Sequence, residues 1–453
     1  MFKQILSKLL EKTSNPISQD KVRVSIFKAE NKIWYIVRNW IFLPFLFATL
    51  FSLPLYVNIF TYINKLYSPY INALLALIAI FIYINIDRKF RFMFGFFIGI
   101  LWFYWIGLSF RFTPAPHFLY IVSIAIGIVY GFVLFFALFF QNILFRIITL
   151  SLMSYLVILG FDWFVPDSML AYSIFKVDKL SFCAIVIIIA IVSLKWLRFY
   201  RFIVLAALIL FIDFNTTKAE LPNTKINITQ TKIPQRIKWQ DVNLDSIEEY
   251  NYKIIEDSIN KGYDLVVLPE TSIPITINIK NDTIERLSNL SKKIDIVIGA
   301  ARTDSIGVYN TTYVFKKGKY NFVDKIYLAP FGEYMPIPIT LLDIFGKISG
   351  LHYNNTFNKY NIPPQNLVAG NIFFRNAICY EATTRAMYED NPQYMIVTSN
   401  NAWFEPSIMS ILQMMLIKYY SRLYGTIVFH STNYSKSMTI MPNNNLNIIA
   451  KGF

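Results

Sequence analysis

Long apolar runs recur along the first half of the chain, whereas polar sequence with short apolar runs makes up the second half. A helix of about 20 apolar residues crosses the hydrocarbon core of a bilayer. The pattern therefore predicts a transmembrane domain of about seven helices over residues 39–214, preceded by a basic segment over 1–38. Because six further runs follow the first, a cleaved signal peptide is excluded. The seven runs lie near 40–60, 70–86, 92–110, 118–140, 143–160, 180–195 and 200–214.

From residue 215 onward, short apolar segments alternate with amphipathic stretches. Residues 225–233 alternate as a strand does, and 264–270 and 294–300 are typical of short buried strands. Helices are predicted at 243–261, 281–293 and 411–423, with further strands in YNTTYVF, FVDKIYLA, NIFFRNAICYE and YMIVTSN. Strands that alternate with helices predict a layered α/β domain over residues 215–453.

Composition and charge support this division. Of the 453 residues, 55% are hydrophobic and 16% are charged, against about 25% charged in ordinary soluble domains. This excludes a disordered chain, a collagen-like chain and a plain soluble enzyme. Most of the net charge of +15 lies in the apolar half, which indicates a membrane protein and not a nucleic-acid binder.

The basic residues also predict orientation. Lys and Arg concentrate in the N-terminal segment and in the loops that share its side of the membrane, including Arg88, Lys89, Arg91 and Lys195. The positive-inside rule then places the N-terminus in the cytoplasm and delivers residue 215 onward to the outer side.

Cysteine and histidine are scarce. The chain has two cysteines, Cys183 and Cys379, and three histidines. No cluster of these residues has zinc spacing, and two thiols do not make a disulfide framework. We therefore expect no metal and no cofactor.

Three predicted strand ends carry reactive groups, namely Glu270, Lys325 and Cys379. Taken singly, each has an ordinary interpretation: a loop acid, a surface lysine and a core cysteine. Together they suffice for acyl transfer without histidine. A carboxylate takes the thiol proton, and an ammonium stabilises both the thiolate and the oxyanion of a tetrahedral intermediate.

These residues and their flanks, LPET, K-x-x-L-x-P-FGEY-x-P and ICYE, resemble the carbon–nitrogen hydrolase (nitrilase) superfamily. Behind a multi-span membrane domain, they resemble the apolipoprotein N-acyltransferase family in particular. The resemblance implies an αββα sandwich in which Glu270 is the base, Lys325 the oxyanion stabiliser and Cys379 the nucleophile. Supporting roles fall to Glu333, Tyr380, Glu381 and Trp239, with the backbone N–H of Tyr380 as a candidate oxyanion donor.

The resemblance also implies a reaction. An acyl chain passes from a membrane phospholipid to the cysteine as a thioester, and then to the α-amino group of the N-terminal diacylglyceryl-cysteine of an apolipoprotein. It implies a multi-pass protein of the bacterial inner membrane, with the catalytic domain in the periplasm, and we expect a monomer that binds no nucleic acid. Two alternatives remain: a membrane-tethered amidase or nitrilase that hydrolyses a small amide, and a transporter or assembly protein with a degenerate domain.

Residues 334–352 are rich in Ile, Leu and Phe. One interpretation is a core-packing or membrane-resting loop. The other is a mobile apolar arm that admits lipid tails through Leu341, Leu342 and Phe345.

The sequence also departs from the family pattern. Asn401 stands where an acid is usual, and Glu405 and Ser435 stand where glycines are usual. Family members are expected to continue into a final membrane helix, and no apolar run after residue 430 is long enough to span.

Overall fold

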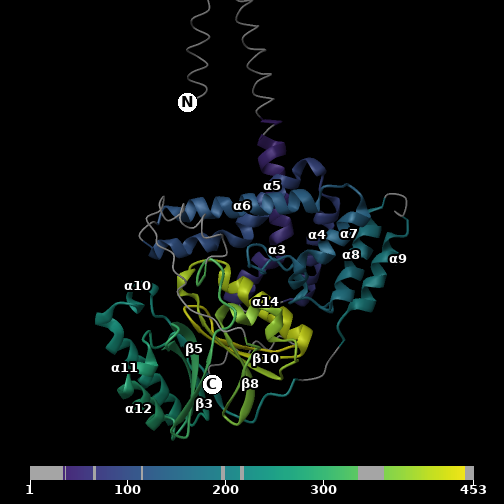
Figure 1. Cartoon of the computed structure of the whole chain (residues 1–453). Coiled ribbons are helices and arrows are strands. Elements are labelled where there is room, and N and C mark those ends of the chain that lie inside the picture. The colour runs from purple at the N-terminus through teal and green to yellow at the C-terminus, as the bar shows by residue number, and fades with distance from the viewer. Residues whose placement is uncertain are drawn as a thin grey trace, which may run out of the picture.

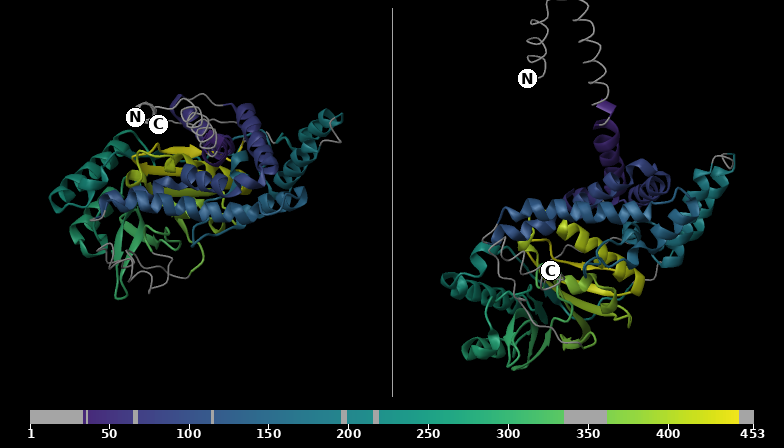
Figure 2. Two further views of the ribbon diagram at one scale, coloured as in Figure 1. Left: turned by 90° about the horizontal axis from the view of Figure 1, so that it is seen from above. Right: turned by 45° about the horizontal axis from the view of Figure 1, so that its top comes forward.

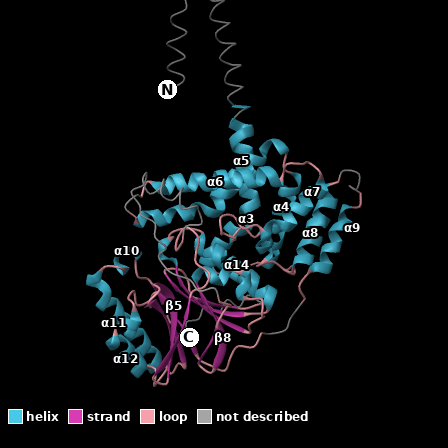
Figure 3. Ribbon diagram, in the orientation of Figure 1, coloured by secondary structure: helices cyan, strands magenta, loops and turns pink. Residues whose placement is uncertain are grey.

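The computed structural model describes residues 34–35, 37–64, 68–113, 116–194, 199–214, 219–334 and 362–443. Figure 1 shows the helices of the first half of the chain on one side and the strands of the second half on the other. Figure 3 shows the same division by secondary structure, with all strands gathered away from the helices of the first half.

Each predicted apolar run of the first half contains a helix. Its elements are η1 (Val37–Phe42), α3 (Leu43–Asn64), α4 (Pro69–Asn85), η2 (Arg88–Phe90), α5 (Arg91–Phe103), η3 (Tyr104–Phe112), α6 (Phe118–Ala137), α7 (Ile143–Leu152), η4 (Met153–Tyr155), η5 (Pro166–Leu170), α8 (Lys179–Ser193), α9 (Arg201–Ala206) and η7 (Ala207–Phe211).

The number of spans differs from the prediction. Within the described ranges, three helical stretches are long and apolar enough to cross a membrane: Val37–Ile59, Arg88–Phe112 and Phe118–Ala137. The other four runs carry shorter apolar helices. The run predicted at 143–160 shows why, because its helix ends by Tyr155 and the backbone turns through positive φ at Leu159 and Gly160. The structure therefore supports a membrane domain of several apolar helices, and a count of seven spans is not confirmed.

Helices α5 and α6 approach each other closely through glycine. A Cβ atom at Gly95 would lie 2.4 Å from the carbonyl oxygen of Tyr130, and one at Gly99 would lie 2.7 Å from the Tyr130 Cβ. Only glycine permits this distance, as is common where helices pack in membranes. The contact fixes α6 beside η3, and these two elements line the apolar pocket described below.

The second half contains two sheets. The first has the order β1-β3-β4-β5-β6, formed by β1 (Ile226–Ile228), β3 (Leu265–Val267), β4 (Asp295–Thr303), β5 (Val308–Lys316) and β6 (Lys319–Asp324). The second has the order β11-β10-β9-β8-β7, with β2 paired to β10. It is formed by β2 (Gln230–Thr231), β7 (Asn366–Ala369), β8 (Ile372–Ile378), β9 (Tyr394–Asn400), β10 (Ile427–Asn433) and β11 (Met438–Ile440).

The apolar clusters show four layers. Val266 of β3 packs with Tyr252 and Ile255 of α11 (Asp241–Asn260). Its neighbours Leu265 and Val267 pack instead against the second sheet, as the two-residue period of a strand requires. Helix α12 (Asn281–Leu290) joins α11 on the outer face of the first sheet, and α14 (Met409–Tyr424) covers the second sheet. The predicted αββα sandwich is therefore confirmed.

Helix α14 also packs on the membrane half, between the second sheet and the helices above it (Figure 2). The Arg422 guanidinium near its end donates to the carbonyl oxygens of Leu170, Ala171, Ser173 and Phe175. It also forms a 2.8 Å ion pair with Asp213. Buried side chains from both halves form one continuous cluster around this helix. The two halves therefore share a core, which holds the sandwich in a fixed position against the helices.

Candidate active site

The reactive side chains predicted from the sequence converge at the ends of strands from both sheets. Glu270 follows β3, Lys325 follows β6 and Cys379 follows β8. Cys379 has φ +53°, a conformation that is uncommon for a residue with a side chain and that concentrates at functional sites. The sharp turn directs its side chain out of the sheet plane toward the groups contributed by the first sheet.

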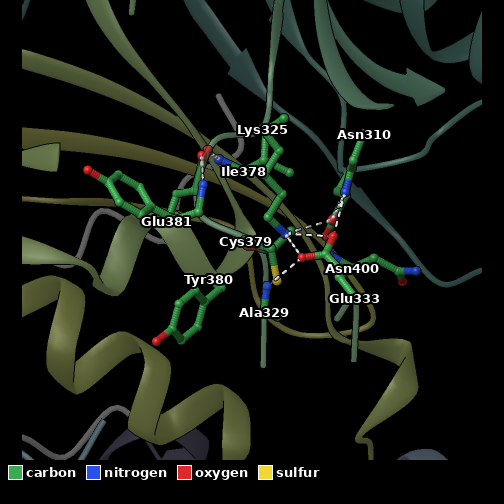
Figure 4. A network of polar contacts seen from close by, with 12 residues as sticks. Asn310, Lys325, Ala329, Glu333, Ile378, Cys379, Tyr380, Glu381 and Asn400 are labelled. Carbon is green, nitrogen blue, oxygen red and sulfur yellow. Dashed lines mark hydrogen bonds and ion pairs between the residues drawn. The ribbon is translucent and has the colours of Figure 1, made fainter. Parts of the chain in front are cut away.

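Lys325 is buried with 1% of its surface exposed. Its Nζ lies 2.8 Å from Glu333 Oε2 and 3.7 Å from Glu270 Oε1, and Figure 4 shows the Glu333 carboxylate facing the end of this side chain. Burial alone would lower the pKa of Lys325, but the charges of Glu333 and Glu270 outweigh it and raise the pKa above its ordinary value. Lys325 is therefore a fixed cation in the site.

Glu270 is held by groups that leave its orientation little freedom. Its Oε1 accepts a hydrogen bond from Asn310 Nδ2 at 2.7 Å, and its Oε2 accepts one from the backbone N–H of Asn400 at 2.7 Å. The Asn310 amide also donates to Glu333 at 3.1 Å. One asparagine of β5 thus holds both carboxylates around Lys325.

The environment of the Cys379 thiol favours its protonated form. Burial and the negative charge of Glu270 raise the pKa of Cys379 well above its ordinary value, although Lys325 acts in the opposite direction. A thiol of this kind reacts only if a base removes its proton. Glu270 is a carboxylate beside the thiol, and the positive charge of Lys325 favours the thiolate form.

Glu381 fixes the two sides of the site to each other. Its carboxylate accepts hydrogen bonds from the backbone N–H groups of Ile326 and Tyr327 at 2.7 and 3.0 Å, and from that of Ile378 at 2.8 Å. It thereby ties the loop that carries Lys325 to the strand end that carries Cys379. Burial raises the pKa of Glu381 to about 7, against the opposing effect of Lys325 and these N–H groups.

Tyr380 connects the turn at Cys379 to the membrane half. Its hydroxyl donates to the carboxylate of Asp162 at 2.5 Å, and its ring lies nearly parallel to that of Trp163, with centroids 6.0 Å apart. Trp163 in turn donates to the Thr383 hydroxyl at 2.7 Å. The loop after α7 is thus packed directly on the turn that begins at Cys379.

An apolar space adjoins the sulfur. A small pocket is lined by Cys379, Tyr380, Trp105, Phe404 and neighbouring side chains. It shares Ile106, Phe161 and Phe331 with a second pocket of about 200 Å³, whose remaining lining comes mainly from α6. The second pocket is almost purely apolar, being lined by Ile106, Phe110, Val122, Ala125, Ile126, Val129, Tyr130, Ile158, Leu159, Phe161 and Phe331.

The predicted residues separate into three groups. Glu270, Lys325 and Cys379 come together, and Glu333, Tyr380 and Glu381 make the contacts given above. Trp239 is 45% exposed at the end of the short helix α10 (Gln235–Lys238), so its supporting role stays a prediction. Leu341, Leu342 and Phe345 lie outside the described residues, as does nearly all of the apolar segment to which they belong.

The site also includes Lys238, Asn310 and Asn400, to which the sequence assigns no role. Lys238 is 1% exposed, and its Nζ donates to the backbone oxygen of Glu270 at 3.2 Å. Burial lowers the pKa of Lys238 to about 7, although the Glu270 charge raises it. Its position beside Trp239 was the one available signal. Within the described part of the chain, no group of three or more His, Cys, Asp or Glu side chains is arranged to hold a metal ion.

Comparisons with known proteins show the family to which this sequence is similar. Residues 38–214 match the family model described as apolipoprotein N-acyltransferase integral membrane domain. The apolipoprotein N-acyltransferase of Wolinella succinogenes is 37% identical over 401 residues, covering 87% of this chain and 94% of that protein. That of Helicobacter hepaticus is 39% identical over 390 residues, covering 84% and 96%. Among solved structures, an amidase of the nitrilase superfamily from Nesterenkonia is 13% identical over 50% of this chain and 86% of its own, with a TM-score of 0.36.

Proposed function

The chain belongs to the apolipoprotein N-acyltransferase family, and on this premise we propose that it moves an acyl chain from a membrane phospholipid, through a thioester on Cys379, to an apolipoprotein. The acceptor is the α-amino group of the N-terminal diacylglyceryl-cysteine. Glu270, Lys325 and Cys379 form the catalytic triad of this two-step transfer.

One observation carries the proposal. Cys379 lies where the buried cluster of Glu270, Lys325 and Glu333 meets an apolar pocket lined by helices of the membrane half. The polar side supplies acid–base chemistry, and the apolar side suits a hydrocarbon chain. A substrate that needs both features has a reactive carbonyl attached to a lipid tail, as a phospholipid does.

The first step forms the acyl-enzyme. Glu270 takes the proton from Sγ, and the sulfur attacks the ester carbonyl of the phospholipid. The oxyanion of the tetrahedral intermediate is stabilised by the Lys325 ammonium and the backbone N–H of Tyr380. The C–O bond then breaks, Glu270 returns the proton to the departing alkoxide, and the lysophospholipid leaves.

The second step uses the same groups in the same order. The free α-amine of the acceptor attacks the thioester carbonyl, and Glu270 accepts a proton from the attacking nitrogen. Collapse of the intermediate breaks the C–S bond, and Glu270 returns that proton to the sulfur. The products are the N-acylated lipoprotein and free Cys379. The raised pKa of the thiol supports this cycle, because it restores the protonated sulfur after each turnover.

The charge pattern supports a place for this reaction. Most Lys and Arg residues of the first half fall in segments on one side of the membrane. By the positive-inside rule this favours a cytoplasmic N-terminus and a periplasmic sandwich. Both substrates are anchored in the same membrane by acyl chains. A catalytic domain fixed to the helices through α14 therefore keeps its site at the depth where both arrive.

Hydrolysis of a small amide is not favoured. The relatives that match across more than four fifths of the chain are named apolipoprotein N-acyltransferases. A small amide would leave empty the apolar pocket of about 200 Å³ that adjoins the smaller pocket at the sulfur.

The test is an acyl-transfer assay in proteoliposomes with a radiolabelled phospholipid and a diacylglyceryl peptide. We expect the wild-type protein to trap the label as a hydroxylamine-sensitive thioester when the peptide is absent, and to release it to the peptide when it is added. Cys379→Ala should form neither the thioester nor the acylated peptide. Label that reaches the peptide at the wild-type rate in that variant would overturn the nucleophile, and free fatty acid without peptide acylation would overturn the acceptor.

A further inference from the structure

A buried amide from α14 reaches the nucleophile. Gln413 is fully buried, and its Nε2 lies 3.8 Å from Cys379 Sγ, within hydrogen-bonding distance for sulfur. The same nitrogen lies 3.5 Å from the Ser399 hydroxyl. Gln413 thus approaches the sulfur from the second sheet's covering helix, whereas Lys325 and Glu270 are contributed by the first sheet.

The orientation of this amide is set by a second one. Asn401 is also fully buried, and its Nδ2 donates to Gln413 Oε1 at 3.0 Å and to the Ser435 hydroxyl at 2.7 Å. Because Asn401 presents a donor, the oxygen of Gln413 turns toward it and the NH₂ group of Gln413 turns toward the sulfur. Asn401 and Ser435 are two of the positions at which the sequence departs from the family pattern.

The charges around the sulfur make such a donor useful. Glu270 and Glu333 place negative charge near Cys379, and the Lys325 cation acts against them. A thiolate forms when the nucleophile loses its proton and forms again when the C–S bond breaks. A neutral donor held at 3.8 Å stabilises this anion without adding charge to the buried cluster.

We propose that Gln413 is a further catalytic residue, which donates a hydrogen bond from Nε2 to the Cys379 thiolate in both steps, and that Asn401 and Ser435 are positioning residues that orient its amide. This rests on the proposed function for the identity of the nucleophile alone. A carboxylate at position 401 would accept a hydrogen bond from Gln413, turn the amide over and withdraw its donor from the sulfur.

The experiment measures thiol reactivity and needs neither substrate. Purified protein in detergent, in a Cys183→Ala background, is alkylated with iodoacetamide from pH 6 to 10, and the Cys379 peptide is quantified by mass spectrometry. We expect Gln413→Leu and the isosteric Gln413→Glu to slow alkylation at pH 8 about tenfold or more, the loss that corresponds to one hydrogen bond to an ionised group. The pH profile should move to higher pH by about one unit.

Asn401→Asp tests the positioning role. We expect this variant to shift the alkylation profile of Cys379 to higher pH as the Gln413 variants do, although Gln413 itself is intact. The matched control is Ser421→Ala, since Ser421 is a buried polar residue of the same helix whose hydroxyl donates to the Thr426 carbonyl oxygen. It should keep the wild-type profile.

Two results would overturn the inference. A wild-type alkylation profile in either folded Gln413 variant removes the catalytic role, and the isosteric variant answers the question if the leucine variant does not fold. A wild-type profile in Asn401→Asp, with both Gln413 variants displaced, removes the positioning role. Failure of the proposed acyl transfer would leave these profiles unchanged, so the two proposals are tested separately.

Discussion

The hydroxyl of Tyr380 donates to the carboxylate of Asp162 at 2.5 Å across 218 positions of sequence. Tyr380 directly follows the nucleophile, and Asp162 belongs to the loop after α7 in the membrane half. The contact is reinforced by the Trp163 ring, which stacks on Tyr380 at an interplanar angle of 12°. The active-site turn is therefore positioned by the membrane half as well as by its own sheet.

Breaking this contact should weaken both stability and catalysis. Asp162→Ala leaves the buried Tyr380 hydroxyl without its main acceptor, and we expect it to lower stability by about 1–3 kcal/mol and to slow thioester formation. Asp162→Asn keeps an oxygen acceptor for the Tyr380 hydroxyl. It should therefore lower stability and slow thioester formation less than Asp162→Ala does. Thermal unfolding in detergent and single-turnover acylation provide the two measurements.

A double-mutant cycle with Tyr380→Phe tests whether the two residues act together. If they do, the double variant Asp162→Ala, Tyr380→Phe should be little worse than either single variant. Losses that simply add would contradict the coupling.

Removing the closest partner of Lys325 should be severe. Glu333→Gln takes away the carboxylate 2.8 Å from a cation that is 1% exposed. Breaking one member of a buried pair costs about 3–5 kcal/mol, and we expect acyl transfer to fall at least about 100-fold. Steady-state transfer and the thermal midpoint check this.

The control for that change is Glu389→Gln, which alters an ion pair with Arg385 whose members are both more than half exposed. Exposed pairs contribute about 0–1 kcal/mol, so activity and midpoint should barely move. Comparable losses in the two variants would show that the effect is not specific to the buried cluster.

Lys238 predicts a defined pH dependence of stability. Its pKa falls from 10.5 in the unfolded chain to about 7 in the folded protein, because it is buried. Between these values the unfolded chain binds more protons, so stability rises as pH increases from about 7 to 10.5. Below pH 7 the folded protein bears the full free-energy cost of burying the charged Lys238 side chain, which is roughly 4–5 kcal/mol at most.

Lys238→Met should remove this rise of stability with pH. We expect the variant to raise the thermal midpoint clearly at pH 6.5 and less at pH 9.5. Lys253→Met on the exposed face of α11 is the control, and it should change the midpoint equally at both pH values. An equal gain at both pH values in the Lys238 variant would argue against a neutral buried lysine at high pH.

Much of the fold and the reactive centre could be predicted from the sequence. Glu270, Lys325 and Cys379 stand at the ends of apolar strand segments within specific flanking motifs. A layered α/β domain follows from strands that alternate with amphipathic helices, and the αββα arrangement from the family resemblance. The strands β7, β10 and β11 were missed. Segment β10 is buried along its whole length and includes His430, Ser431, Thr432 and Asn433, so its polar composition concealed a central strand.

Other features depend on contacts that no local pattern records. The run at 143–160 is apolar enough for a span, but its backbone leaves the helix near Tyr155. Gln413 is a polar residue in a helical segment and carries no local sign that it points into the site, and Lys238 has only its position beside Trp239. Asp162 meets Tyr380 only because α14 and the loop after α7 bring the two halves together. Motifs identify groups that react, whereas tertiary packing selects the groups that hold them.

The apolar pocket makes a prediction about acyl-chain length. Val129 of α6 lines the pocket of about 200 Å³ that adjoins the nucleophile's own pocket through Ile106, Phe161 and Phe331. Val129→Trp should fill much of this space. A donor with long acyl chains then loses its binding site, whereas a short-chain donor still reaches Cys379.

We therefore expect the ratio of transfer rates for 16-carbon over 8-carbon phospholipid donors to fall several-fold in Val129→Trp, with the short-chain rate nearly retained. Ile128→Trp, one position earlier and 42% exposed, is the matched control and should keep the wild-type ratio. Equal losses for both chain lengths would indicate general disruption of the site. An unchanged ratio would mean that the acyl chain lies elsewhere, because a bulky indole in its channel must discriminate by length.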